Sequence, residues 1–242
     1  MRLCADLPAH REVWGRLTHA GIAMCPVVDG EILTGTPWTA LTRGRANGIE
    51  LLAGHTRDEF RLFSAMTGRR GTFTEEDART ALEVFAPVPD GADAYRAAHP
   101  GATPEELLET VYSDALFRMP SLLLAEANAT AGGTSYLFEL ALDGVLGACH
   151  SLDVPLAFGT PDSPIGKQLL GDPPAPEAVA VSRELQGAWV RFITDGDPGW
   201  AAYRPDHRLT RVLDADPRTA AYPERDSRRI WEGRPPAPFD LV

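Results

Sequence analysis

The chain has 242 residues, of which 44% are hydrophobic and 24% charged, so it is long enough and apolar enough to bury a core. Its formal net charge of -11 repels phosphate backbones and argues against a nucleic-acid partner. The three cysteines lack CxxC spacing, so we expect no metal and no other cofactor. There is neither a signal-peptide pattern nor an apolar run of the roughly 18 residues that a membrane span needs. We therefore expect a cytoplasmic protein with no membrane partner.

The N-terminal part of the chain predicts little regular structure. Residues 1–48 are punctuated by proline and glycine and predict loops with a brief helix over residues 36–43. A short apolar run between turn signals, residues 49–54, predicts a buried strand, and residues 58–66 predict a short helix after it.

Two helix starts follow, and threonine caps both of them. Thr74 precedes a run of acidic residues that the helix dipole favours. Thr103 is followed by Pro104 at the first helical position and by Glu106, which completes a capping box. An aliphatic stripe then continues at helical spacing, and we expect this long helix to bend or break near Pro120.

The last hundred residues alternate between strands and helices. Residues 134–140 and 209–213 predict strands, and residues 177–194 and 225–232 predict helices. Strands that alternate with helices predict an α/β sandwich. Three strands make a thin sheet for this length, which indicates that part of a larger sheet is absent.

Candidate chemistry gathers after two of the predicted strands. Asp58 and Glu59 follow the strand at residues 49–54, and His150 lies on a glycine-bearing loop after the strand at residues 134–140. In α/β sheets, the loops at the carboxyl ends of the strands build the active site. A carboxylate there can fix the tautomer of an imidazole and stabilise the imidazolium that proton transfer forms.

Four blocks of sequence, in order and at matching distances, carry a resemblance to the type-B carboxylesterases, the cholinesterase-like branch of the α/β-hydrolases. The strongest likeness runs from about Pro26 to the C-terminus, and residues 1–25 match poorly. The blocks are PVVDG at residues 26–30 with Ile32, Leu33 and Pro37; IELLAGHTRDE at 49–59; YLF at 136–138 with GACHSLDVPLAFG at 147–159; and AWVRF at 188–192 with GDP at 196–198.

This resemblance implies a single partial α/β-hydrolase domain over residues 1–242. It would be the C-terminal portion of the sandwich, with few strands flanked by helices and the N-terminal half of the sheet missing. The resemblance places Glu59 at the triad acid and His150 at the general base, with Asp58 as a structural neighbour. Acid before histidine is also the chain order of α/β-hydrolase triads.

The nucleophile of that family lies on a G-x-S-x-G elbow upstream of the acid. None of the eight serines of the chain has glycine two residues before and two after it, and no HGGG-type oxyanion segment is present. Cys149 and Ser151 flank His150, but adjacent side chains diverge, so we expect neither to be the nucleophile. The spacing of Asp195 and Asp197 faintly resembles a calcium loop, but Pro198 spoils it.

We therefore expect the C-terminal half of a serine carboxylesterase, which supplies the acid and the histidine and is inactive alone. Its partners would be a small-molecule carboxylic ester and an N-terminal half, supplied as a separate chain. Two alternatives stay open: a non-catalytic cholinesterase-like binding module, or a truncated gene product. A half-sheet would leave an open strand edge, so the isolated chain should be poorly stable or associate.

Overall fold

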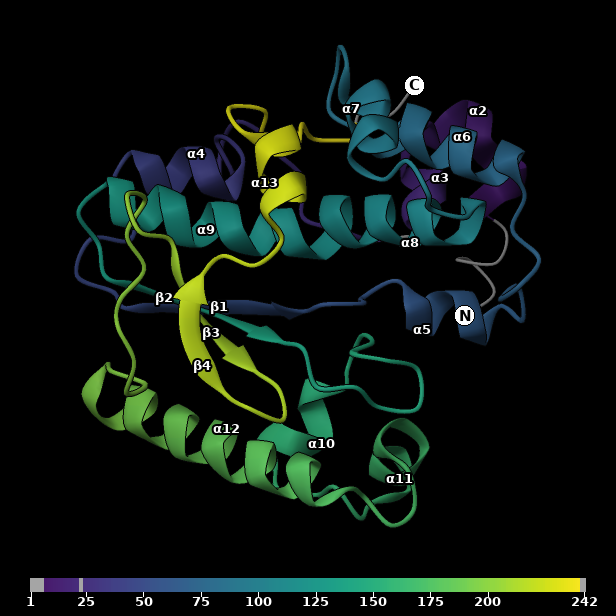
Figure 1. The fold of residues 1–242 in the computed structure, drawn as a ribbon. Coiled ribbons are helices and arrows are strands. Elements are labelled where there is room, and N and C mark those ends of the chain that lie inside the picture. Colours follow the sequence, from purple (N-terminus) through teal and green to yellow (C-terminus); the bar gives the residue numbers. More distant parts are fainter. Residues whose placement is uncertain (1–6, 22–23, 240–242) are drawn as a thin grey trace.

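A four-stranded sheet lies between two layers of helices in the computed structural model, which describes residues 7–21 and 24–239 (Figure 1). The strands lie side by side in chain order. The first three are parallel, and the fourth returns antiparallel to the third. In chain order the strands are β1 (Leu51–Thr56), β2 (Ser135–Leu140), β3 (Leu209–Leu213) and β4 (Arg218–Ala221).

The upper layer of helices in Figure 1 comes mainly from the segments before β1 and between β1 and β2. The elements before β1 are η1 (Leu7–His10), α2 (Arg11–Trp14), α3 (Leu17–Ala20) and α4 (Pro37–Thr42). Between β1 and β2 lie α5 (Arg61–Met66), α6 (Glu75–Phe85), α7 (Gly91–Ala98), α8 (Pro104–Ser113), the π-helix η2 (Asp114–Arg118) and α9 (Met119–Thr130). The last helix of the chain, α13 (Arg225–Trp231), also lies in this layer.

The lower layer comes from the segment between β2 and β3. It contains α10 (Asp153–Ala157), α11 (Pro164–Leu170) and the long α12 (Pro176–Asp195). Because α9 and α12 cover opposite faces of β2, all six residues of this strand are buried. Leu137 packs into the core under the upper helices, and Phe138 and Leu140 pack into the core above α12. This explains why β2 is apolar at successive positions.

The packing of β2 against β1 explains why position 54 of β1 is a glycine. Gly54 pairs with Phe138 in the parallel register. The Phe138 ring crosses over Gly54 and packs edge-on against Trp189 of α12, with ring centroids 5.1 Å apart. A Cβ at position 54 would collide with the ring, so only glycine leaves room for it.

Local signals predicted most of these elements. Both threonine caps are present: Thr74 and Thr103 each accept a hydrogen bond from the backbone of the third helical residue, and both capping boxes are closed. The expected break near Pro120 is the π-helix η2, in which the Met119 N–H donates to the carbonyl of Asp114, five residues earlier. Since Pro120 has no N–H, this is the turn where the regular pattern has to change.

Two predictions need correction. The sheet has a fourth strand, β4, whose residues are mostly exposed and lack the apolar alternation that predicts a strand. The short helices α7, α10 and α11 were also missed, because alanine, glycine and proline hide their periodicity. Among the described residues, no helix combines the length and apolar character that crossing a bilayer requires.

Candidate active site

The turn after β1 holds the first candidate residue in a fixed position. β1 ends at Thr56, and its N–H donates to Glu59 Oε1 at 2.7 Å. The helix α5 begins two residues after Glu59. The turn therefore folds the Glu59 carboxylate back over the end of its own strand, where it is buried.

The loop after β2 brings the second candidate residue to the same place. An isolated parallel bridge joins Asp58 to Cys149, and the His150 N–H donates to the carbonyl of Glu59 at 3.3 Å. Ser151 then adopts φ of 66°, a left-handed conformation that is uncommon outside glycine. This sharp reversal separates His150 from the helix α10 that follows.

Glu59 and His150 meet directly, although 91 positions separate them in the sequence. The His150 Nδ1–H donates to Glu59 Oε2 at 2.6 Å. The Glu59 side chain is only 6% exposed, whereas that of His150 is 36% exposed. The hydrogen bond to Glu59 raises the pKa of His150 above its ordinary value, against the opposing effect of partial burial.

The other ring nitrogen of His150 is free within the described part of the chain, where no hydrogen bond reaches Nε2. Two aromatic rings flank the imidazole. Phe63 of α5 lies with its centroid 5.2 Å from that of His150, and Phe117 of η2 lies 4.9 Å away. Both rings are partly exposed, and they form an apolar wall beside the imidazole.

No nucleophile accompanies the pair among the described residues, because no serine, threonine or cysteine side chain is hydrogen-bonded to the imidazole. Cys149 is fully buried in the lower core, and burial raises the pKa of its thiol to about 11. The thiol is therefore protonated at neutral pH. The residues at 195–197 end α12, whose C-cap is Gly196 in a left-handed conformation.

A buried polar cluster next to the pair was not predicted. His55 and Glu139 pair across β1 and β2, with His55 Nε2 3.9 Å from Glu139 Oε2. His55 Nδ1 donates to the carbonyl of Thr56, which leaves Nε2 to accept from the Tyr222 hydroxyl at 3.1 Å. Burial lowers the pKa of His55 to about 4 and raises that of Glu139 to about 8, so both are neutral near pH 7. The contact is a neutral packing interaction and not an ion pair.

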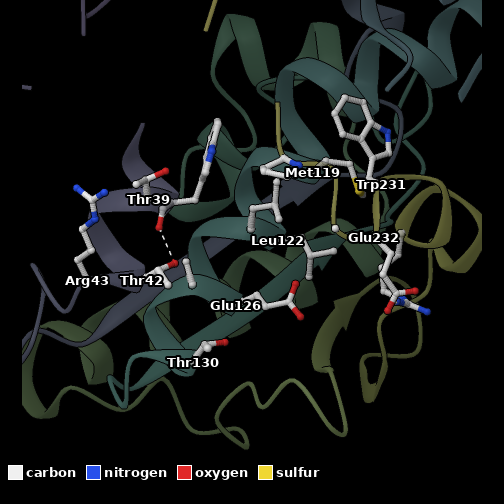
Figure 2. A pocket seen from close by; sticks show the side chains of 15 residues that line it. Thr39, Thr42, Arg43, Met119, Leu122, Glu126, Thr130, Trp231 and Glu232 are labelled. Carbon is white, nitrogen blue, oxygen red and sulfur yellow. Dashed lines mark hydrogen bonds and ion pairs between the residues drawn. The ribbon is translucent and has the colours of Figure 1, made fainter. Parts of the chain in front are cut away.

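A separate cavity lies away from His150 and Glu59. It has a volume of about 480 Å³ and opens between α4, α9 and α13 (Figure 2). Its lining includes Trp38, Met119, Leu122 and Trp231, and neither Glu59 nor His150. Among residues 7–21 and 24–239, no group of three or more histidine, cysteine, aspartate or glutamate side chains is close enough to hold a metal ion.

Comparison with known proteins gives this geometry a context. Residues 5–222 match the model of the carboxylesterase family. The chain belongs to this family. It is similar to the para-nitrobenzyl esterase of Bacillus subtilis (strain 168), with 30% identity over an alignment of 219 residues that covers 84% of this chain and 42% of the relative. The phenmedipham hydrolase of Pseudarthrobacter oxydans is 29% identical over an alignment of 205 residues that covers 79% of this chain and 40% of that relative.

Solved structures agree with this assignment. The crystal structure of the Geobacillus stearothermophilus carboxylesterase EST55 matches with a TM-score of 0.73 and 28% identity, over 87% of this chain and 46% of that one. A PNB esterase matches with a TM-score of 0.74 and 26% identity, over 93% and 46% of the two chains. The chain thus spans about half the length of the relatives and solved structures that it matches. The α/β-hydrolase fold expected from the sequence is therefore confirmed.

Proposed function

We propose that this chain supplies the general base and its orienting acid for the hydrolysis of a carboxylic ester. The observation that carries the proposal is the 2.6 Å bond from His150 Nδ1 to the buried Glu59, which leaves Nε2 without a partner among the described residues on a partly exposed side chain. A donor bond at Nδ1 fixes the tautomer in which Nε2 accepts a proton. Membership of the carboxylesterase family supports the same chemistry.

In this mechanism His150 moves one proton twice in each half of the reaction. Nε2 takes the hydroxyl proton of a serine while the serine oxygen bonds to the ester carbonyl carbon. When the tetrahedral intermediate collapses, the bond from carbon to the alcohol oxygen breaks, and His150 returns the proton to the departing alcohol. Water then repeats both steps on the acyl-serine. Glu59 stays ionised throughout and stabilises the imidazolium.

The substrate proposed for this site is a small carboxylic ester with an apolar group. The rings of Phe63 and Phe117 lie beside His150, so an apolar part of the ester held near Nε2 would pack against them. One relative is named for a para-nitrobenzyl substrate, which supports an aromatic group at this wall.

The serine would come from a segment outside these 242 residues, which contain no G-x-S-x-G elbow. The open edge of β1 is the proposed docking place, because within the described residues β1 pairs with β2 alone. Two apolar side chains near this edge are exposed: Ile49 just before β1, and Ile193 in the last turn of α12. The end of α12 lies near this edge because Gly196 is close to Glu50. An added parallel strand would cover the edge and bring an N-terminal half to the site.

Labelling with a fluorophosphonate probe tests the proposal. The probe is applied to the pure chain and to the chain mixed with an N-terminal half. This half is produced as a separate chain. We expect labelling only in the mixture, on the added serine, with loss of labelling when His150→Ala replaces the wild-type chain. Turnover of a p-nitrophenyl ester should follow the same pattern.

The alternatives make different predictions for the same experiment. Absence of labelling in the mixture, with both chains folded and associated, would favour a non-catalytic binding module. Absence of association would favour a truncated gene product. Labelling of the chain alone, sensitive to His150→Ala, would show that one of its own serines is the nucleophile and would overturn the proposal.

A further inference from the structure

The carboxylate of Asp58 lies next to Glu59 in sequence and takes no part in the proposed proton transfer. Its Oδ2 accepts a hydrogen bond from the backbone N–H of Ala148 at 3.0 Å. The same oxygen lies 3.1 Å from Arg57 Nη2 and 3.3 Å from Arg61 Nη1. The Asp58 N–H donates in turn to the carbonyl of Ala148 at 2.8 Å. Asp58 therefore bonds both the backbone N–H and the carbonyl of Ala148, which lies two residues before His150.

The two arginines tie this contact to the rest of the fold. Arg57 Nη1 donates to the carbonyl of Ala141, at the end of β2, and Nη2 also bonds Asp143. Arg61 Nε donates to Glu109 Oε2 of α8 at 3.3 Å. The Asp58 carboxylate is thus held from the β1 turn, from the β2 end and from α8. Its side chain is only 15% exposed, so competition from water is small.

The loop at this point is shaped to fit the carboxylate. Gly147 adopts φ of +71°, where a side chain is strained. A Cβ at position 147 would collide with Arg61 Nη1 and lie 2.8 Å from Asp58 Oδ2. The backbone of the histidine loop therefore passes directly against the Asp58–Arg61 pair.

We propose that Asp58 is a positioning residue, which clamps the histidine loop to the turn after β1 and so sets the distance between His150 and Glu59. Apart from the pair's own bond, the direct link from His150 to the acid is a backbone hydrogen bond of 3.3 Å, which is long and weak. Two loops that are 91 positions apart need a stronger link to keep an imidazole within hydrogen-bonding range of a carboxylate. The proposal rests on the proposed function for its catalytic consequence only.

Nuclear magnetic resonance of the 242-residue chain tests the clamp without any catalysis. The readouts are the far-downfield Nδ1–H resonance of His150 and the pKa of its ring. Asp58→Ala and Asp58→Asn remove the same charge, but asparagine keeps an oxygen that can accept from Ala148. We expect Asp58→Ala to lose the downfield resonance and to bring the pKa of His150 toward its ordinary value of about 6.5. Asp58→Asn should lie between this variant and the wild type.

The charged groups around His150 set the controls. Glu59 and Asp153 are the carboxylates that act on its pKa, and Phe63 and Phe117 supply only apolar surface. Asp143→Asn removes the exposed outer partner of Arg57 and should leave both readouts unchanged. Equal effects of Asp58→Ala and Asp58→Asn would mean that the charge of Asp58, and not its hydrogen bond to Ala148, acts on His150, which would contradict the clamp. Unchanged readouts in folded Asp58→Ala would also overturn it. If Asp58→Ala does not fold, Asp58→Asn decides, and a lower melting temperature with a wild-type His150 resonance would reduce Asp58 to a stability residue.

A second arm uses the mixture with the N-terminal half. Asp58→Ala should lower kcat more than it changes KM and should move the lower limb of the pH profile to lower pH, because that limb reports the His150 base. The failure of the mixture to hydrolyse any ester would count against the proposed function and would leave the resonance result intact. The two proposals therefore fail separately.

Discussion

At the scale of single residues, the contact between Glu59 and His150 couples protonation to stability. The hydrogen bond raises the folded-state pKa of His150 above that of the unfolded chain. Its contribution is therefore fully present below the unfolded pKa of about 6.5 and is lost as pH rises through the folded pKa. Glu59→Gln removes the carboxylate charge but keeps the size of the side chain.

We predict that Glu59→Gln lowers the free energy of unfolding more at about pH 6 than at about pH 8, and urea denaturation measures this. The same substitution should reduce kcat of the complemented enzyme by about 10³- to 10⁴-fold, as loss of the triad acid does elsewhere. In a His150→Ala background the pH dependence of the stability difference should vanish. A deficit of equal size at both pH values would contradict the coupling.

At the scale of elements, Gly54 and Phe138 show how β1 and β2 fit together. The ring occupies the space above the glycine and connects the sheet to Trp189 of α12. We predict that Gly54→Ala costs about 1–3 kcal/mol of stability, because the new methyl group displaces the ring. Phe138→Leu should absorb part of this cost, and thermal melts of the two single variants and the double variant would show a coupling. Strictly additive costs would contradict the close approach.

The same elements show what the sequence alone could predict. Thr103, Pro104 and Glu106 act within one helical turn, so the start of α8 was predicted and is confirmed. The strand predicted at residues 49–54 is found two residues later, because its end depends on pairing with β2. Strand β4 was missed, since its exposed residues form a strand only by pairing with β3.

The site divides along the same line. Glu59 and His150 were predicted as a pair because their blocks resemble those of a known family, and the structure brings the two side chains together. The contact of Asp58 with Ala148 and the ring of Phe117 beside His150 could not be predicted, because their contacts join segments far apart in the chain. Such contacts follow from the packing of β1, β2 and η2 together, and no local pattern encodes them.

At the scale of the whole molecule, a substitution at the open edge of β1 can affect docking of a second chain without affecting the fold of this one. The Leu51 N–H donates to the carbonyl of Thr134 at 2.9 Å, whereas the Thr56 N–H points away from β2 to Glu59. Alternate N–H groups of a parallel strand face opposite sides, so that of Leu52 faces the open edge. A proline at position 52 therefore removes no hydrogen bond to β2.

We predict that Leu52→Pro leaves the chain folded but weakens docking of an N-terminal half by about tenfold or more. The loss of one hydrogen bond to the incoming strand costs on the order of 1 kcal/mol, and the proline ring would also clash with that strand. The measurement is the fluorophosphonate labelling gained on mixing, titrated against the added half. Leu51→Pro is the matched control and should lower the melting temperature of the chain itself. Normal docking of folded Leu52→Pro would exclude the β1 edge as the docking place.

The bond between His150 and Glu59 has a practical consequence. All the contacts that hold this pair come from within the chain: the β1 turn, the β2 loop and the helices beside them. On the proposed function, this chain would be the half of an esterase that transfers the proton, and it would be inactive until a second chain supplies the serine. Two proteins of interest, each fused to one half, would restore the hydrolysis of a fluorogenic ester only when they meet, and the pair would serve as a split reporter of molecular proximity.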